Sequence, residues 1–207
     1  MGDFSYTDLL SSEIDKLKRM RQYAAYFESC SRVLDIGCGK GEFLHALAEK
    51  SVDAVGIDTD SLCIARCVEK GLEAEQIDAE SYLSGKDREF DGIMCSHVVE
   101  HLQPDKAQEL FSACFKALSA GGVFIILTPN VGSIRVMTDL FWQDPTHVRP
   151  YPIRLLEMML GRAGFTVEQS GDDRRPKLRG LKGCIRRYIL GEYFCGNDIF
   201  VVARKLA

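Results

Sequence analysis

Long apolar runs, tryptophan and proline are scarce in this chain of 207 residues, which contains one Trp and six Pro. No run approaches the ~20 apolar residues that a membrane-spanning helix needs. The longest, residues 122–128, has the length of a buried strand. The N-terminal residues contain neither a basic stretch nor a continuous apolar stretch, so no secretory signal is visible. These absences predict a cytoplasmic globular protein.

Closely spaced cysteine pairs are also lacking. The eight cysteines include no CxxC pair and fall mostly inside apolar segments. Scattered cysteines of this kind are typical of small buried hydrophobic side chains, whereas zinc sites and disulfide frameworks show regular spacings. We therefore expect reduced thiols, no disulfide and no bound metal ion.

The charge balance excludes a broadly basic protein, because 26 Lys and Arg stand against 30 Asp and Glu, a net charge of −4. Nucleic-acid-binding proteins usually carry a wide positive surface, so we expect no nucleic-acid partner. One local exception is the segment 174–187, RRPKLRGLKGCIRR, which holds seven basic residues and no acid. Three interpretations stay open for it: contact with an anionic acceptor, an amphipathic helix on a membrane surface, or a solvated loop.

Apolar segments of strand length alternate with amphipathic segments of helix length, after a helical lead-in over residues 1–30 that begins at a capping box formed by Ser12 and Asp15. This alternation predicts an α/β fold with a doubly wound, mostly parallel sheet in one domain. Ligands of such sheets bind at the carboxyl ends of the strands, near the point where strand order reverses. The strands are expected at 33–36, 54–57, 74–77, 90–95, 123–127 and 198–203, and the helices at 42–50, 61–70, 106–118 and 153–160.

The first strand runs into a glycine-rich turn, GCGKG at residues 37–41, which opens a helix. Such a turn exposes backbone amides to a ligand, although a tight strand-to-helix turn alone would also use these glycines. Its GxGxG spacing and the nearby carboxylate of Asp35 disfavour a pyrophosphate, which argues against a dinucleotide-dependent oxidoreductase. Asp58 ends the second strand, where a carboxylate accepts hydrogen bonds from ribose hydroxyls. Together these features predict an adenosine-type ligand.

The same motifs resemble those of the class I S-adenosylmethionine-dependent methyltransferases. Residues 33–43 (VLDIGCGKGEF) and 56–60 (GIDTD) are similar to the first two motifs of that family, and 77–81, 90–102 and 118–130 to later ones. The resemblance implies a Rossmann-like, seven-stranded sheet and S-adenosylmethionine as cofactor, with S-adenosylhomocysteine as product. It divides the single domain 1–207 into the lead-in, a cofactor-binding half (31–130) and an acceptor-side half (131–207).

The resemblance also implies which residues hold the cofactor. The methionine part would meet Asp35 and the glycine-rich turn, the ribose would meet the end of the second strand, and the adenine would meet the segment after the third. The end of the fourth strand would line the same pocket. The implied residues are, in chain order, Asp35, Gly37, Cys38, Gly39, Asp58, Thr59, Asp78, Ala79, Cys95, Ser96 and His97.

Residues 97–101, HVVEH, also match the inverted zinc-peptidase pattern HxxEH. That pattern needs a continuous helix, whereas here an apolar strand precedes His97 and Pro104 follows closely. We therefore expect no zinc hydrolase. His97 and His101 are candidates either for acid–base chemistry or for hydrogen bonds within a turn.

Polar residues concentrate on the segment 142–151, WQDPTHVRPY, after the fifth strand, where an acceptor would enter. A capped turn is the alternative interpretation of this segment. It resembles the loop of a methyltransferase subgroup associated with surface polysaccharide and O-antigen synthesis. That resemblance suggests His147 as general base, Asp144 as its orienting partner or a ligand of the acceptor, and Arg149 as a clamp on an anionic group. Trp142 and Tyr151 would also bind the acceptor, and His101 would be a further catalytic residue.

The loop resemblance therefore implies metal-independent O-methylation of a carbohydrate-like or other small acceptor, and a hydroxyl acceptor would benefit from a base that titrates near neutrality. Two alternatives stay open at this point. One is a methyltransferase that acts on RNA or protein, and the other is a module that binds S-adenosylmethionine without turnover. The sequence indicates neither the acceptor nor an oligomeric state.

Overall fold

The computed structural model describes residues 13–173 and 196–206. Two features of the sequence analysis lie outside the described residues, namely the basic segment 174–187 and the predicted helix cap at Ser12. No helix within the described ranges is both long and apolar enough to cross a membrane.

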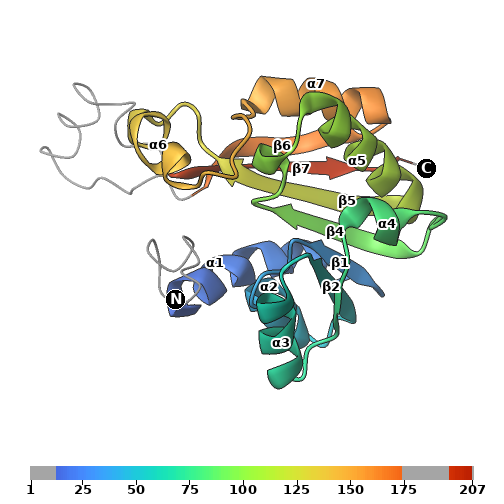
Figure 1. The fold of residues 1–207 in the computed structure, drawn as a ribbon. Coiled ribbons are helices and arrows are strands. Elements are labelled where there is room, and N and C mark those ends of the chain that lie inside the picture. The colour runs from blue at the N-terminus through green and yellow to red at the C-terminus, as the bar shows by residue number, and fades with distance from the viewer. Residues whose placement is uncertain (1–12, 174–195, 207) are drawn as a thin grey trace, which may run out of the picture.

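Seven strands of the described residues form one sheet with the order β3-β2-β1-β4-β5-β7-β6 (Figure 1). The first five run parallel, while β7 is antiparallel to both β5 and β6. The predicted seven-stranded, mostly parallel sheet is therefore confirmed. The strands are β1 (Val33–Ile36), β2 (Ala54–Asp58), β3 (Ala74–Gln76), β4 (Phe90–Ser96), β5 (Leu118–Pro129), β6 (Thr166–Asp173) and β7 (Asp198–Arg204).

Helices cover both faces of the sheet, as the alternation of strands and helices requires. On one face α1 and α2 pack on the side chains of Val33, Met94 and Ile125, and α3 packs beside them on β2 and β3. On the other face α4, α5 and α7 bury residues such as Ile93 and Phe124. The helices are α1 (Glu13–Ala24), α2 (Glu42–Ala48), α3 (Ser61–Glu69), α4 (Ala79–Leu83), α5 (Pro104–Ala117), α6 (Ile134–Thr138) and α7 (Ile153–Ala163), with short 3₁₀ turns η2 (Ala25–Phe27), η3 (Val99–His101) and η4 (Leu140–Gln143).

Strands β6 and β5 show where apolar periodicity is an incomplete guide. The sequence TVEQSGDD of β6 is polar and mostly not buried, because this edge strand pairs only with β7, and periodicity did not predict it. Strand β5 begins at Leu118 and runs through Gly121 and Gly122, which were expected to end the preceding helix. That helix, α5, begins two residues earlier than predicted, with Pro104 in its first turn, where the missing N–H costs no hydrogen bond.

The strand order reverses between β1 and β4, which lie side by side in the middle of the sheet. The loops that follow β1 and β4 therefore diverge to opposite faces and leave a crevice at the carboxyl ends of the strands. Several of the predicted site residues, though not all, lie at this position.

Candidate functional site

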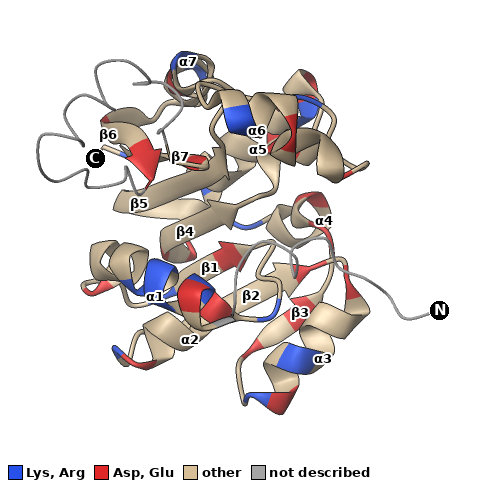
Figure 2. Cartoon of the chain, turned by 90° about the vertical axis from the view of Figure 1, so that its left-hand side faces the viewer, with Lys and Arg blue, Asp and Glu red and all other residues tan. Residues whose placement is uncertain are grey.

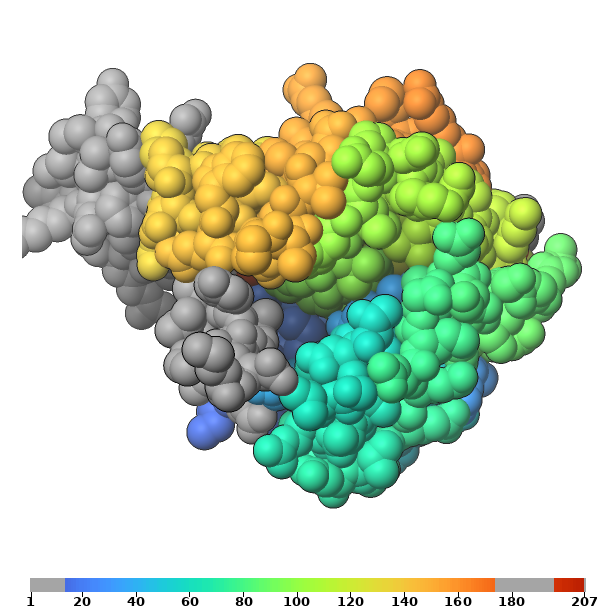
Figure 3. Space-filling view, in the orientation of Figure 1, coloured from blue at the N-terminus to red at the C-terminus, as the bar shows by residue number. Residues whose placement is uncertain are grey.

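A cleft of about 1500 Å³ opens at the carboxyl ends of β1, β2 and β4. Figure 3 shows this face hollowed between the green segment that carries α5 and the teal segment that carries α3. The predicted residues that line it come from four separate loops: Gly37, Gly39, Asp58, Thr59, Asp78, Ala79, Ser96, His97 and His101. Thr146, from the loop expected to meet the acceptor, lines it as well.

The glycine-rich turn touches the segment that follows β4. Gly37 has a φ of +71°, and a Cβ on it would lie 2.4 Å from Val98 Cγ2, so a side chain here would displace that segment. Gly39 has a φ of +52°, yet no atom would lie within 4 Å of its Cβ. A glycine is therefore favoured at position 39 because the backbone there is left-handed. The space beside Gly39 stays open to the cleft.

The backbone amides of this turn are already used within the protein. The N–H groups of Gly37 and Cys38 both donate to the Ile57 carbonyl oxygen, at 2.9 and 3.0 Å, and Gly39 N–H donates to Asp58 Oδ2 at 2.9 Å. The expectation that these amides point freely at a ligand carboxylate is wrong for these three groups. Their hydrogen bonds connect the turn after β1 to the end of β2 instead.

Asp58 is fixed by two backbone donors at the end of β2. Its Oδ1 accepts from Asp60 N–H at 2.9 Å and its Oδ2 accepts from Gly39 N–H. Asp60 in turn caps α3 by accepting from Leu62 N–H at 2.8 Å. Each carboxylate oxygen has two lone pairs, so Asp58 retains capacity to accept two hydroxyl hydrogens from the cleft side.

Asp35 lies beneath the turn, in β1, with only 2% of its surface exposed (Figure 2 shows the acidic residues along β1 and β2 in red). Desolvation, with the nearby charges of Cys67, Asp58 and Glu42, raises the pKa of the Asp35 carboxyl well above its ordinary value. A cation placed beside Asp35 would offset this cost. Asp35 is not among the residues that line the cleft, so its contact with a positively charged part of a ligand stays a prediction.

Asp78 caps α4 at the far side of the cleft. Its Oδ1 accepts from Ser81 N–H at 2.8 Å and its Oδ2 from Ser81 Oγ at 2.7 Å. The hydrogen bonds from Ser81 lower the pKa of Asp78, so this carboxylate is a charged acceptor at neutral pH. Apolar side chains of Ile77 and Leu83 lie beside it in the cleft.

Two cysteines predicted to meet the cofactor point elsewhere. Cys95 is fully buried in the core between the sheet and α5, on the same face as Ile93, two residues earlier in the strand. The Cys38 thiol packs against Leu44 and Cys67, on the opposite side of the turn from the cleft. The prediction that Cys95 lines the pocket is therefore wrong, because strand alternation directs its thiol into the core. Cys38 was implied only as part of the turn whose backbone would hold the cofactor, and that role stays a prediction.

His97 follows β4 and is one of three described non-glycine residues with positive φ, here +56°. Its Nδ1 lies 3.1 Å from Glu100 Oε1, and the buried Glu100 accepts from Thr128 Oγ1 at 3.0 Å on its other oxygen. His97 Nε2 lies 3.7 Å from Asp198 Oδ1. Burial lowers the pKa of His97, but the charges of Asp198 and Glu100 outweigh it, so the pKa lies above its ordinary value.

The loop after η4 is tied to the same glutamate. The Glu100 carbonyl oxygen accepts from Val148 N–H at 2.8 Å and from Arg149 N–H at 3.2 Å. Asp144 accepts from the N–H and the hydroxyl of Thr146, at 2.8 and 2.6 Å, and that hydroxyl also lies 2.9 Å from His101 Nδ1. These contacts bring the loop against the cleft.

His147 and Asp144 are not hydrogen-bonded to each other. His147 Nδ1 lies 2.6 Å from the Phe141 carbonyl oxygen, so this nitrogen carries a hydrogen, and its Nε2 is 3.9 Å from Asp144 Oδ2. Both hydrogen bonds from Thr146 reach Asp144 Oδ1, while Oδ2 is the oxygen that lies nearer His147, so the role of Asp144 as orienting partner of His147 or as ligand of the acceptor stays a prediction.

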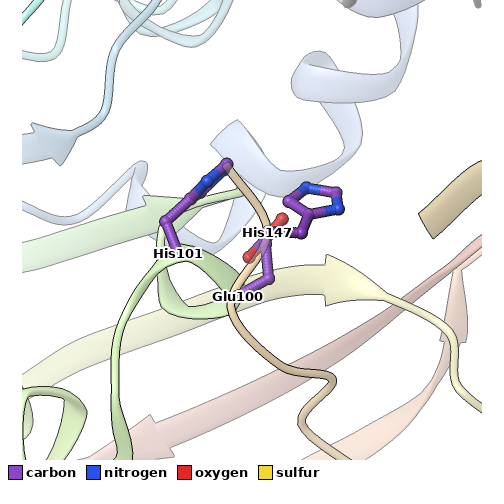
Figure 4. Close-up of side chains that lie close together, drawn as sticks. All are labelled: Glu100, His101 and His147. Carbon is purple, nitrogen blue, oxygen red and sulfur yellow. The ribbon is translucent and has the colours of Figure 1, made fainter. Parts of the chain in front are cut away.

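Glu100, His101 and His147 converge, with one nitrogen or oxygen of each within 4.8 Å of the others (Figure 4). The two imidazole rings have centroids 4.8 Å apart. Both Glu100 oxygens already accept protein hydrogen bonds, and one nitrogen of each imidazole faces an acceptor. We interpret the group as three neighbouring side chains, each held by hydrogen bonds to residues outside the group, at the point where η3 meets the loop.

The three residues predicted to bind the acceptor differ in position. Tyr151 is fully buried and its hydroxyl donates to the Leu102 carbonyl oxygen at 2.8 Å, so its predicted contact with an acceptor is wrong. Trp142 is 62% exposed and lies outside the cleft, with its Nε1 donating to the Met137 carbonyl oxygen. The Arg149 guanidinium stacks over the Tyr151 ring at 5.2 Å.

Residues that the sequence analysis did not single out complete the site. Thr128 at the end of β5 donates to Glu100, Asp198 at the start of β7 lies near His97 Nε2, and Arg19 in α1 pairs with Asp198. They come from positions far apart in the chain, and no local motif signals their convergence. Glu100 was visible only within the zinc-peptidase pattern, which the short η3 turn rules out as a continuous helix.

The cleft fits the adenosine-type ligand that its residues suggest. Asp58 is fixed with acceptor capacity left, Asp78 is charged at the opposite side, apolar Ile77 lies between, and the open position at Gly39 leaves room beside them. A doubly wound seven-stranded sheet with this set of residues at its reversal point defines a class I S-adenosylmethionine-dependent methyltransferase.

Comparison with known proteins gives the family directly. A family model described as "Methyltransferase domain" matches residues 10–170, and the chain belongs to this family. A solved structure of a SAM-dependent methyltransferase from Archaeoglobus fulgidus superposes with a TM-score of 0.84 at 29% identity, over 97% of this chain and 100% of that one.

Curated relatives match a smaller part of this chain. A ubiquinone biosynthesis O-methyltransferase of Psychrobacter arcticus is 35% identical over 107 residues, which is 48% of this chain and 41% of that protein. A probable S-adenosylmethionine-dependent methyltransferase of Mycolicibacterium smegmatis is 32% identical over 67% of this chain and 53% of its own length. The matched region thus spans about half the length of these relatives.

Proposed function

We propose that this chain transfers the methyl group of S-adenosylmethionine to a hydroxyl oxygen of a small acceptor, carbohydrate-like or otherwise. The observation that carries the proposal is the single cleft that runs from Asp58 and the glycine-rich turn to His97 and His101. The names of the curated relatives, ubiquinone biosynthesis O-methyltransferases, support oxygen as the accepting atom. The loop at residues 142–151 is the support for a glycan-like acceptor.

The cofactor assignments follow the chemistry of each position. Asp58 and Thr59 would accept the ribose hydroxyls, Asp78 and Ala79 would border the adenine, and Asp35 would offset the positive charge of the amino-acid end. When bound, S-adenosylmethionine supplies a methyl group on a positively charged sulfur. The protein's part is to align the acceptor with that group and to exclude water, and positioning provides much of the rate.

The acceptor would enter beside His101 and Thr146, where the loop after η4 borders the cleft. Arg149 could clamp an anionic group, since its Nε is buried without a hydrogen-bond partner and its charge is held over Tyr151. His147 as general base, Asp144 and His101 as its catalytic companions, and Trp142 as an acceptor contact stay predictions. So do the cytoplasmic location, the absence of a metal requirement and the role of the basic segment 174–187.

Methyl transfer from labelled S-adenosylmethionine tests the proposal. Purified chain is incubated with nucleotide sugars, glycan fragments and hydroxylated quinone-like compounds, and product is analysed by mass spectrometry. We expect label on an oxygen of one class of small acceptor. Label only on RNA or protein would favour the alternative substrates, and cofactor binding without transfer to any substrate would favour a binding module.

A further inference from the structure

The segment after β4 places an unusual histidine next to the cofactor turn. His97 lines the cleft with 39% of its side chain exposed, whereas the His147 side chain is 11% exposed and does not line it. The neighbouring Val98 is the residue that a Cβ on Gly37 would strike. A group held at the glycine-rich turn is therefore adjacent to His97, since β1 and β4 are paired up to Ile36 and Cys95.

The backbone of His97 is held in a conformation that side chains rarely adopt. A φ of +56° is strained for a non-glycine residue, because the Cβ approaches a backbone carbonyl oxygen. The position is fixed by His97 N–H, which donates to the Leu127 carbonyl oxygen at 2.9 Å, and by the side-chain contact with Glu100. Strain of this kind persists where the surrounding structure imposes it, and it is frequent at functional sites.

Glu100 orients the imidazole. Glu100 is fully buried, and burial alone would raise its pKa, but the hydrogen bond and charge of His97 lower it, so the carboxylate is ionised. A carboxylate can only accept, so His97 Nδ1 donates to Glu100 Oε1 and the neutral ring presents an unprotonated Nε2. Within the described residues Nε2 makes no hydrogen bond, and Asp198 Oδ1 lies 3.7 Å from it.

We propose that His97, oriented by Glu100, is the residue that takes the proton from the acceptor hydroxyl; this rests on the proposed function. In the step, the hydroxyl proton passes to His97 Nε2 while the acceptor oxygen bonds to the methyl carbon. The carbon–sulfur electron pair stays on sulfur, which becomes a neutral thioether. Glu100 acts through His97 as a positioning residue, and Thr128 holds Glu100 by donating to its second oxygen.

The charged groups around His97 favour the protonated ring that forms in this step. Glu100 on η3 and Asp198 on β7 are negative, while Arg19 on α1 opposes them and is itself paired with Asp198 at 2.8 Å. The net effect raises the pKa of His97 above its ordinary value, despite partial desolvation. A base must be neutral to act, so activity is expected to fall as pH drops through this value.

His97→Asn is the informative variant. Asparagine tolerates the left-handed backbone, and its side-chain N–H can donate a hydrogen bond to Glu100. Its side chain cannot take a proton near neutral pH. We expect kcat/KM to fall at least about 100-fold, the usual contribution of a general base, with the Kd for S-adenosylmethionine changed less than about threefold. His45→Asn, at an exposed position on α2, is the matched control and should leave both unchanged.

Glu100→Gln separates positioning from structure. It keeps the shape of the side chain but removes the negative charge that raises the His97 pKa, so the acidic limb of the kcat/KM profile should move to lower pH and kcat should fall about tenfold. A purely structural role would lower activity without moving the limb. If the His97→Asn variant transfers the methyl group at the wild-type rate, the assignment of His97 as the base is wrong while the proposed function stands. If the wild-type protein transfers a methyl group to no hydroxyl, the proposed function is wrong and so is the assignment.

Discussion

Gly39 N–H donates to Asp58 Oδ2 at 2.9 Å, which joins the turn after β1 to the end of β2. The two motifs on which the sequence analysis depended are thus one structural unit. The hydrogen bond fixes both the turn and the carboxylate, so the proposed ribose-binding position is held in place by the protein itself. Preformed sites of this kind lose less entropy on binding.

Asp58→Ala is therefore expected to weaken S-adenosylmethionine binding strongly. Hydrogen bonds to a charged group contribute about 1.5–3 kcal/mol each, so loss of one should raise Kd by about tenfold to somewhat over 100-fold. Ligand-induced thermal shift measures the change. Asp53→Ala is the control, because Asp53 pairs with Arg32 on the surface at the other end of β2. An unchanged Kd in Asp58→Ala would show that the ribose assignment is wrong.

Asp35→Asn is expected to lower the affinity for S-adenosylmethionine and to raise the stability of the fold. The Asp35 pKa is raised in the folded state, so folding stability is greatest below the unfolded pKa, near 4, and declines as pH rises through the folded value. The amide removes that cost at pH 7, and the melting temperature should rise, by roughly 2–4 °C per kcal/mol gained. Cofactor affinity should fall about tenfold or more. A variant that is destabilised and binds normally would contradict this role.

Tyr151→Phe tests a correction made by the structure. The Tyr151 hydroxyl serves the Leu102 carbonyl in the core, so its removal should cost about 1 kcal/mol of stability and leave kcat/KM within about twofold of wild type. Chemical denaturation and steady-state kinetics measure the two effects. A large increase in the KM of the acceptor, with normal stability, would restore the original prediction.

His147→Ala compares the two candidate bases. The variant loses a hydrogen bond to the Phe141 carbonyl and the contact with the His101 ring, which should loosen the loop and lower kcat less than His97→Asn does. Cofactor affinity should be nearly unchanged. If His147→Ala abolishes transfer while His97→Asn retains it, His147 is the base, as the sequence analysis had it.

Removal of metal ions should have no effect. Dialysis against EDTA is expected to leave kcat/KM within about twofold, since both oxygens of the buried Glu100 are engaged by His97 and Thr128. Activity that is lost on chelation and restored by a divalent cation would contradict the metal-independent mechanism.

The sequence predicted the fold through short-range regularities. Buried strands such as β1 and β2, and the glycine positions of the first turn, leave local signals in apolar runs and residue type. Cys95 and Tyr151 were misassigned because their motifs lie at the site while strand alternation and core packing direct these two side chains inward. The contact between His97 and Glu100 was not predictable, since no residue-type signal marks a left-handed histidine. Asp198 and Arg19 reach it only through the tertiary fold.

The most direct test of the central claim is calorimetric titration of metal-free protein with S-adenosylmethionine and S-adenosylhomocysteine, with NADH as the competing ligand. The cleft formed by Asp58, the glycine-rich turn and Asp78 predicts saturable binding of both sulfur ligands at micromolar concentration and none of NADH. Absence of binding, or binding of NADH alone, would contradict the account.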